Sequence, residues 1–541
     1  LTDKDGGVYH VNFIEKILAT TLAKISNLIP DAGIWMNTQR PEWNDANNAL
    51  VGNGVSMVTL YYLRRFLAFF NRVLANSENQ DIQISTELYD CFNSIKVVLE
   101  QYHSNLETGF SKAERKSFMD ALGAAATTFR DGIYNAGFSG NKSTLDLSDL
   151  DDFYRISNAY LEASIESNER TDKLYHAYNI IEIEGNEVGV SYLDEMLEGQ
   201  VGVLSSGYLK AEKVLGLIDA LRSSAIYRAD QNSYILYPNK ELKGFMDRNQ
   251  VPAASVQQSE LLQTLVKDGN VTIIEKDVAG VYHFHGAIRN SFELDKAIDK
   301  LDSSYAKLIA QDRTLVQNIY EEVFNHKTFT GRSGTFYGYE GLGSIYWHMV
   351  SKLLLAVEEC TIDAVHGDTK EETLNALKAH CHEVFEGIGV HKSPDVYGAF
   401  SIDPYSHTPG YKGAQQPGMT GQVKEDVISR IIELGVDVNE GKLSFSPTIL
   451  DKSEFIKEAS HFEYVDLNGD FKTMELPANS LAFTYCQVPV VYTVSDSDRI
   501  VSTTKNGEIN TIDGSVCDSE LSQELFKRTS EIEKLEVYLN L

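Results

Sequence analysis

Apolar residues recur at three- and four-residue intervals along most of the first 170 residues, which is the spacing of helices with one buried face. The helices predicted there span 11–29, 56–74, 82–102 and 113–136. Several breaks between them are short, as in antiparallel helical hairpins. The same spacing returns at 305–325, 343–359, 369–387 and 423–434. A mainly α chain is therefore expected.

Strand patterns occupy two other regions of the chain. Residues 180–190 predict a β-hairpin that turns at Gly185-Asn186. Further strand candidates in the same region are 233–237, 271–274 and 280–284. After Gly435 the expected strands are 443–446, 462–465, 481–494 and 500–503. A helix around 519–539 is expected to close this last part.

The simplest architecture for this pattern is an (α/α)6 toroid of helical hairpins with an α+β insertion and a small C-terminal β domain. A chain of 541 residues has room for two or three domains. The predicted divisions are the first part of the barrel at 1–179, the insertion at 180–301, the second part of the barrel at 302–435 and the β-rich domain at 436–541. The chain opens at Leu1 almost directly into a helix, so a further N-terminal part of the same polypeptide is expected.

The net charge of the chain excludes some classes of ligand. The chain has 78 acidic and 48 basic side chains, a formal net charge of −30. Such a field repels the phosphates of nucleic acids and anionic membrane surfaces, so neither is an expected partner. A neutral sugar suits this surface better. An anionic co-substrate would need a local pocket of basic groups or backbone amides.

Cysteine usage and hydropathy bear on the compartment. The five cysteines are scattered and form no CxxC pair, which predicts free thiols in a reducing compartment. The chain has no apolar run of about 18 residues, the length that a membrane helix needs. A cytoplasmic protein is expected.

The first segment with candidate chemistry is residues 40–54, between two predicted helices. Glu42 and Asp45 stand on either side of Trp43, next to amide side chains such as Asn44. The apolar face of a pyranose stacks on an indole, and low polarity near the indole raises a carboxyl pKa toward that of a general acid. The alternative is an Asp- and Asn-rich loop that caps the following helix.

A second segment, residues 332–349, combines glycines and aromatic residues with Arg332, Glu340 and His348 at the start of a predicted helix. Glycines let backbone amides approach an anion, and the N-terminus of a helix favours negative charge. The alternative is that Glu340 caps the helix and His348 is a histidine of the core.

A third segment, residues 403–422, is a loop rich in Gly, Pro and Gln that leads into a helix at Thr420 and Gly421. Loops on rigid scaffolds often contain functional residues. A hydroxyl and backbone amides at this helix start would point at a bound anion. The alternative is a simple N-cap after a mobile connection.

Metal chemistry is not expected. His283 and His285 share one face of a predicted strand, but no third ligand stands near them in the sequence. His380 and His382 fall in a predicted helix, where residues two apart diverge.

Together the three loop segments resemble the inverting β-glycoside phosphorylases of the cellobiose phosphorylase clan, most of all the β-1,3-oligoglucan phosphorylases of the glycoside hydrolase family 149 type. The residues that carry the resemblance are Trp43-Asn44-Asp45 with the stretch to Gly54, His348, and the Thr420-Gly421 pair. Glu42 departs from it, because many members have Asp there. Members also have an N-terminal β-sandwich and first barrel helices that have no counterpart in this chain. The chain is expected to be the C-terminal part of such an enzyme.

The resemblance implies a role for each candidate residue. Asp45 would be the general acid. The implied sugar contacts are Trp43, Asn44, Glu42, Glu340, Gln415 and Gln416. The implied phosphate contacts are His348, Thr420, Gly421 and Arg332. The expected partners are a β-glucan oligosaccharide, inorganic phosphate as co-substrate and a second copy in a homodimer, with no cofactor and no metal.

The expected reaction is reversible phosphorolysis that gives α-glucose 1-phosphate and a shortened oligosaccharide. Two alternatives remain open at this point. An inverting β-glucan hydrolase on the same barrel would need Glu340, Asp403 or Asp426 as the base that activates water. A non-catalytic carbohydrate-binding fragment would need none of them.

Overall fold

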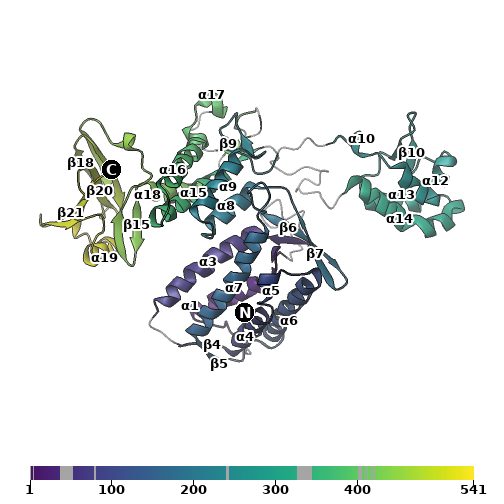
Figure 1. Cartoon of the computed structure of the whole chain (residues 1–541), viewed down its shortest axis with the longest axis horizontal. Coiled ribbons are helices and arrows are strands. Elements are labelled where there is room, and N and C mark those ends of the chain that lie inside the picture. The colour runs from purple at the N-terminus through teal and green to yellow at the C-terminus, as the bar shows by residue number, and fades with distance from the viewer. Residues whose placement is uncertain are drawn as a thin grey trace.

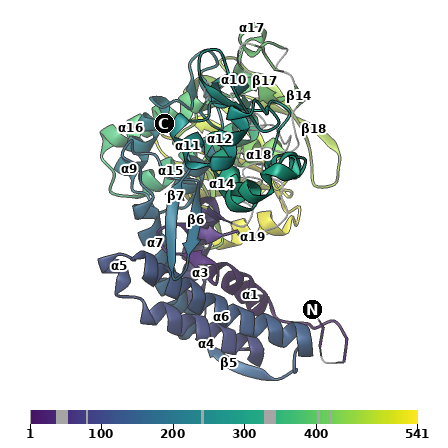
Figure 2. The same ribbon diagram turned by 90° about the vertical axis from the view of Figure 1, so that its right-hand side faces the viewer.

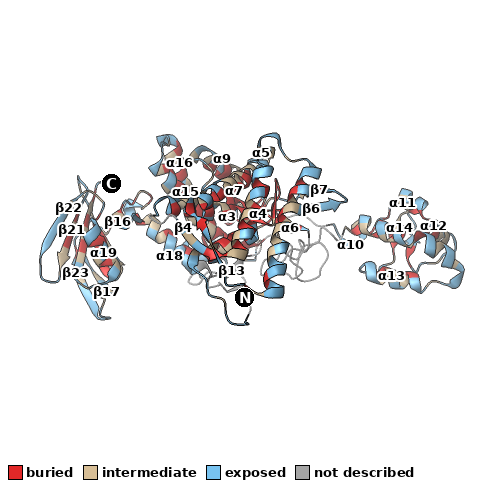
Figure 3. Ribbon diagram, turned by 90° about the horizontal axis from the view of Figure 1, so that it is seen from below, coloured by how far each residue is buried: buried red, intermediate tan, exposed pale blue. Residues whose placement is uncertain are grey.

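The computed structural model describes residues 2–3, 5–36, 53–77, 81–238, 243–325, 344–399, 405–408, 410, 412–414, 416–417 and 421–541. Helices dominate the described residues before 435 and strands dominate those after it (Figure 1). Buried residues gather in three places, which we call the helical body, the insertion body and the C-terminal body (Figure 3). The described part of the chain is about half helical, and the closed (α/α)6 toroid stays a prediction.

The helical body begins with helices that each bury one face. They are α1 (Phe13–Ile25), α3 (Met57–Ala75), α4 (Thr86–Gln101), α5 (Asn105–Thr108), α6 (Lys112–Ala136) and α7 (Leu147–Ser167). Local signals set their starts. The Asn12 side chain accepts the Glu15 amide at α1, and Ser111 with Glu114 forms a capping box at α6. Two predicted helices were too long, because α1 ends at Ile25 and the strand Asp81–Ser85 precedes α4.

A five-stranded antiparallel sheet with the order β1-β2-β3-β6-β7 packs against these helices, and its strands β6 and β7 lie next to α3 and α6 (Figure 2). Its strands are β1 (Leu28–Ile29), β2 (Gly33–Trp35), β3 (Gly54–Ser56), β6 (Tyr178–Glu184) and β7 (Glu187–Tyr192). A separate pair is formed by β4 (Asp81–Ser85) and β5 (Lys142–Asp146). The hairpin predicted around Gly185 is confirmed, with Gly185 at a φ of +57°. Strand β3 leads directly into α3, whose first turn is capped by Ser56.

The rest of the helical body surrounds α15. Its helices are α8 (Leu197–Ser205), α9 (Ala211–Arg222), α15 (Trp347–His366), α16 (Glu371–Glu386), α17 (Pro394–Tyr397) and α18 (Gly421–Glu433), with a 3-10 turn at Gly389–His391. A short hairpin of β8 (Tyr227–Arg228) and β9 (Ser233–Tyr234) lies beside them. Helix α15 packs against α8, α9, α16 and α18.

Helices α3, α8 and α15 run in the same direction. Gly202 in α8 lies against the Tyr61 ring in α3, and one turn further along both helices Arg65 Nη1 donates to the Ser205 carbonyl at 3.2 Å. Strand β9 is adjacent both to the start of α8 and to the strand that precedes α15. Further along, the Cys360 thiol of α15 donates to the Leu204 carbonyl of α8 at 3.4 Å. The N-termini of these three helices therefore share one end of the helical body.

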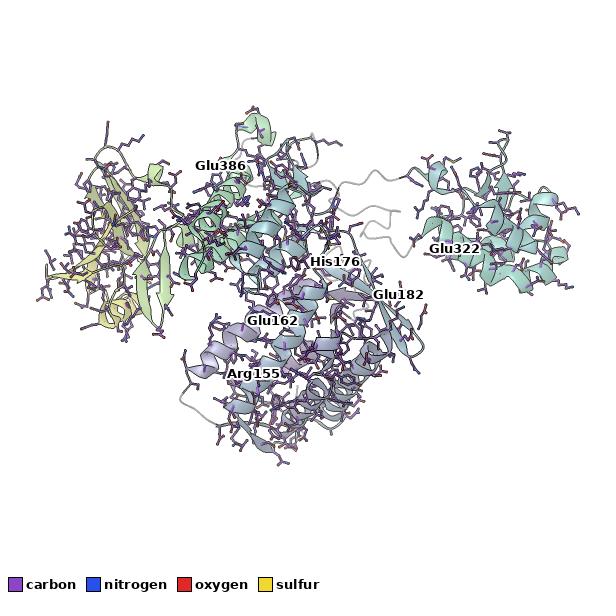
Figure 4. All side chains as sticks on the ribbon, viewed as in Figure 1. Arg155, Glu162, His176, Glu182, Glu322 and Glu386 are labelled. Atoms are coloured by element: carbon purple, nitrogen blue, oxygen red, sulfur yellow. The ribbon has the colours of Figure 1, made fainter. Side chains whose placement is uncertain are left out.

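The insertion body has a core of its own, built from residues between Val251 and Phe324. Its elements are α10 (Phe245–Arg248), α11 (Ala253–Gln258), α12 (Glu260–Lys267), β10 (Ile274–Lys276), β11 (Tyr282–Phe284), α13 (Ser291–Asp299), a 3-10 turn at Ser303–Tyr305 and α14 (Ala306–Phe324). Figures 1 and 3 both show it apart from the helical body. In Figure 4, Glu322 labels the insertion body, while His176 and Glu182 label the helical body.

Packing divides this part of the chain differently from the predicted insertion at 180–301. Residues of α8, α9 and β9 are buried in the helical body, whereas α14 belongs to the insertion body. The physical reason is that Leu217, Ile218 and their neighbours bury their apolar faces against α15 and α16. The change from helical to strand-like spacing of apolar residues marks where strands begin. It does not show in which hydrophobic core those strands are buried.

The C-terminal body is a five-stranded sheet with the order β19-β20-β23-β21-β22, packed on α19 (Ser519–Lys527). Its sheet strands are β19 (Ser480–Tyr485), β20 (Val488–Val494), β21 (Arg499–Thr504), β22 (Ile509–Asp513) and β23 (Ile532–Leu539). Two further pairs are β15 (Val436–Asn439) with β16 (Lys442–Phe445), and β17 (Ser460–Val465) with β18 (Phe471–Leu476), and a 3-10 turn lies at Lys452–Glu454. Gly435, at a φ of +64°, joins this body to α18.

The prediction of one helix over 519–539 was wrong. Helix α19 ends at Lys527, and Arg528 adopts the left-handed conformation that stops it. Residues 532–539 form β23 in the centre of the sheet, parallel to β20 and antiparallel to β21. Leu535, Val537 and Leu539 are buried at every second position, a period-two signal that the helical spacing before it concealed.

Within the residues that the structure describes, no helix is both long and apolar enough to cross a lipid bilayer.

Candidate functional site

A three-stranded sheet joins the second and third loop segments. It consists of β12 (Ile345–Tyr346), β13 (Tyr405–Thr408) and β14 (Gln416–Pro417) in that order. Tyr346 pairs with His407, and His407 pairs with Gln416 across an irregular register. Two stretches that lie about 60 residues apart in the sequence are thus brought side by side, immediately before α15 and α18.

Helices α15 and α18 start from this sheet and run in the same direction. Trp347 directly follows β12 as the first residue of α15, and Gly421 is the first residue of α18, four positions after Pro417. Further along the two helices, the Glu358 carboxyl of α15 lies beside the Ser429 hydroxyl of α18. Since α3 and α8 begin at the same end, the positive ends of four helix dipoles face this end of the helical body.

His348 is the second residue of α15 and is partly buried. Its Nδ1 lies 3.1 Å from the Tyr346 Oη, a hydrogen bond that orients the imidazole. An imidazole and the backbone amides in the first turn of a helix can together bind an anion. The arrangement has the chemistry expected of a phosphate site.

Most of the other predicted site residues lie outside the described residues. They are Glu42, Trp43, Asn44, Asp45, Arg332, Glu340, Gln415 and Thr420, and with them Asp403. Gln416 is described in its backbone, in β14, and Gly421 at the start of α18. The first loop segment ends at β3, where the Ile181 amide of β6 donates to the Asn53 carbonyl at 2.9 Å. Each of the three segments therefore leads into a helix that begins at the same end of the helical body.

Sequence reasoning missed a group of residues around Thr408, the last residue of β13. The Trp347 Nε1 donates to the Thr408 hydroxyl at 2.9 Å, and Arg228 Nη1 donates to its carbonyl at 3.0 Å. Lys392 Nζ lies 4.6 Å from the centre of the Trp347 ring. Burial lowers the pKa of Lys392 to about 7, helped by the positive charge of Arg228 and opposed by Asp230. No local motif marks these residues, because they come together from positions as far apart as 180 residues.

Buried carboxyl groups line the contact between α15 and α18. Burial raises the pKa of Glu358 to about 8, with Ser429 acting against the shift and Glu433 adding to it. Asp426, a candidate base for a hydrolase, lies on α18, and burial and the adjacent Glu425 raise its pKa.

The histidine pairs do not form metal sites in the described part of the chain. His283 Nδ1 contacts the Asn249 carbonyl at 2.5 Å, and its Nε2 lies 3.2 Å from an Asp277 carboxylate oxygen. These contacts connect β11 to its own body. Among the described residues, no group of three or more His, Cys, Asp or Glu side chains could hold a metal ion.

The comparison with known families gives a match for the insertion body. Residues 242–327 match the family model of GH149 phosphorylase insertion domain 2. The match supports a glycoside phosphorylase of the GH149 type. Its limits enclose α10 to α14 and agree with the core that the structure shows there, rather than with the division at 180–301. Such an enzyme belongs to carbohydrate metabolism. A comparison with curated proteins finds no match.

Proposed function

We propose that the protein catalyses the inverting phosphorolysis of β-glucan oligosaccharides by inorganic phosphate. The proposed linkage of these oligosaccharides is β-1,3. The products are α-glucose 1-phosphate and an oligosaccharide shortened by one unit. The observation that supports this most is the match of residues 242–327 to an insertion domain of GH149 phosphorylases. Support also comes from the helical body, where α3, α8, α15 and α18 begin at one end and His348 stands in the first turn of α15. Helix N-termini favour an anion such as phosphate, even in a chain of net charge −30.

In the proposed mechanism Asp45 is protonated before the reaction. It donates this proton to the glycosidic oxygen as the bond from that oxygen to the anomeric carbon breaks. A phosphate oxygen forms the new bond to the anomeric carbon from the opposite face, and the proton released from the phosphate restores Asp45. Phosphate is already an anion, so no second carboxylate is needed ~6.5–9.5 Å away to activate water, as it is in an inverting hydrolase.

The remaining assignments belong to the same proposal. His348, Thr420, the Gly421 amide and Arg332 bind phosphate, while Glu340, Gln415 and Gln416 contact the sugar with the residues around Trp43. The protein acts in the cytoplasm as a homodimer, with no cofactor and no metal. The helices close into an (α/α)6 toroid around the sugar.

The test is incubation of the protein with α-glucose 1-phosphate and laminaribiose, with cellobiose as the linkage control. Release of inorganic phosphate and growth of a longer oligosaccharide are expected with laminaribiose. In the reverse direction, sugar release should require phosphate. Sugar release at the same rate without phosphate would establish a hydrolase instead, and binding of the oligosaccharide without turnover a non-catalytic protein.

A further inference from the structure

Residues that lie far away in the sequence contact Thr408 at its hydroxyl and at its carbonyl. The Trp347 indole at the start of α15 donates to its hydroxyl at 2.9 Å, and Arg228 of β8 donates to its carbonyl at 3.0 Å. Both Thr408 and Trp347 are fully buried. Strand β13 is thereby fixed at its last residue, next to the turn that starts α15.

Among the residues that the structure describes, the Arg228 guanidinium donates hydrogen bonds to Asp230 and to Thr408. Its Nε and Nη2 donate to the two carboxylate oxygens of Asp230 at 2.9 and 2.7 Å, while Nη1 donates to the Thr408 carbonyl. The carboxylate orients the planar fork, so the third donor points at β13. An ammonium group has no such fixed geometry, and lysine cannot replace arginine here without loss.

A second set of contacts holds the Trp347 ring in place. The Lys392 ammonium lies over the ring and donates to Gln231 Oε1 at 3.3 Å, while the Tyr397 ring packs against the indole edge-on, with 5.8 Å between ring centres. Gln231 in turn donates to the Val396 carbonyl at 2.6 Å. The turn that follows β8 and the segment around Lys392 therefore support the same indole that binds Thr408.

We propose that Arg228 is a positioning residue that, through Thr408, sets β13 and β14 against the start of α15. Because β14 leads into α18, this contact fixes the distance between His348 and the amides at the start of α18. Inorganic phosphate binds to both groups, so its affinity depends on this distance. The phosphate part of the inference rests on the proposed function, whereas the fixing of β13 does not.

Removal of the Arg228 side chain should lower the affinity for phosphate more than the affinity for the oligosaccharide. Without the Nη1 donor, the buried Thr408 carbonyl loses its charged partner and β13 can shift away from α15. A hydrogen bond to a charged group of this kind corresponds to about 10- to 100-fold in an equilibrium constant. We expect that loss in the affinity for phosphate, with a much smaller change in the KM for the oligosaccharide.

The experiment compares Arg228→Gln and Arg228→Lys with Arg222→Gln as the matched control. Arg222 contacts the same hairpin over the Tyr227 ring and pairs with Glu383. Phosphate affinity is measured by calorimetry with inorganic phosphate, and the exchange of the β13 amides by hydrogen–deuterium exchange. Both Arg228 variants should bind phosphate about 10- to 100-fold more weakly and exchange the β13 amides faster. Arg222→Gln should change neither property.

A third variant, Asp230→Asn, covers the case in which Arg228→Gln does not fold. This variant keeps the arginine but removes the carboxylate charge that orients its guanidinium. It should weaken phosphate binding less than Arg228→Lys does. Unchanged exchange of the β13 amides in all three variants would overturn the positioning role. Faster exchange with unchanged phosphate affinity would overturn the link to phosphate. A wild-type protein that binds no phosphate would overturn the proposed function, and the exchange result would still decide the fixing of β13.

Discussion

At the residue scale, His348 is the described side chain to which the proposed function assigns phosphate binding. It stands in the first turn of α15, where backbone amides have no partner within the helix, and Tyr346 orients its ring. The three loop segments were singled out by their residue types, since Trp, Asp, Gly and His gather there, and their roles stay predictions. The contacts of Arg228, Lys392 and Trp347 could not be predicted in this way, because they depend on which distant segments the fold brings together.

Replacing His348 by Asn should raise the KM for phosphate by about 10- to 100-fold, since a charged or polar contact to a dianion is lost. The KM for the oligosaccharide should change little. Steady-state kinetics with each substrate varied in turn checks this expectation. His366→Asn, at the other end of the same helix, is the control. Equal effects of the two substitutions on the phosphate KM would contradict the assignment of His348.

Replacing Asp45 by Asn should lower kcat by ~10²–10⁴-fold, the usual contribution of a general acid. The fold should be preserved, as circular dichroism would show. Asp426→Asn is the informative comparison, because Asp426 would be a base only in a hydrolase. Phosphorolysis at near the wild-type rate in Asp45→Asn, or its loss in Asp426→Asn, would contradict the proposed mechanism.

At the scale of elements, apolar periodicity predicted the long helices well and the strands next to them less well. Helix α14 at Ala306–Phe324 lies within one residue of the predicted 305–325. Strand β23 was missed because its pairing partners β20 and β21 precede it in the sequence by some 30 residues or more. The sheet of β12, β13 and β14 was also not foreseen, since strands of two to four residues have too few side chains to show a period.

The contact between α15 and α18 should weaken as pH rises. Burial raises the pKa of Glu358 to about 8, above the ordinary value of 4.5 that applies in the unfolded chain. The folded state therefore binds the proton more tightly, so stability is full below about pH 4.5 and falls as pH rises toward 8. Glu358→Gln, which is neutral throughout, should have a Tm higher than wild type by roughly 2–4 °C at pH 8 and a similar Tm at pH 5.

Differential scanning fluorimetry at the two pH values measures this difference. Glu371→Gln, which removes an exposed carboxylate in the first turn of α16, is the control. A gap between Glu358→Gln and wild type that stays constant from pH 5 to pH 8 would show that Glu358 does not titrate there.

At the scale of the whole molecule, the described residues form three bodies with separate cores, and the described part of the candidate site lies in the helical body. The presence of an insertion could be predicted from the change in sequence texture. Its limits could not, because residues such as Leu217 and Val316 are equally apolar and differ only in the core that receives them.

The insertion body should fold on its own. Residues 242–327 contain a complete core with buried residues from α11 through α14. A peptide of that range should show a helical circular dichroism spectrum and one cooperative thermal transition. As the comparison, residues 180–238 should not fold alone, since their apolar faces are buried against α3 and α15. A non-cooperative melt of 242–327 would contradict this independence.

The common direction of four helices has a consequence for how the protein responds to ionic strength. The attraction of helix N-termini acts within about one turn, whereas the repulsion from a net charge of −30 extends further into solution. Dissolved salt screens charges beyond ~10 Å at 0.1 M, so it removes the repulsion and leaves the short-range amides. Phosphate should therefore associate faster as sodium chloride rises from 10 to about 100 mM, the opposite of a site on a basic protein. Rapid-mixing measurements of the association rate would reveal the sign of this dependence.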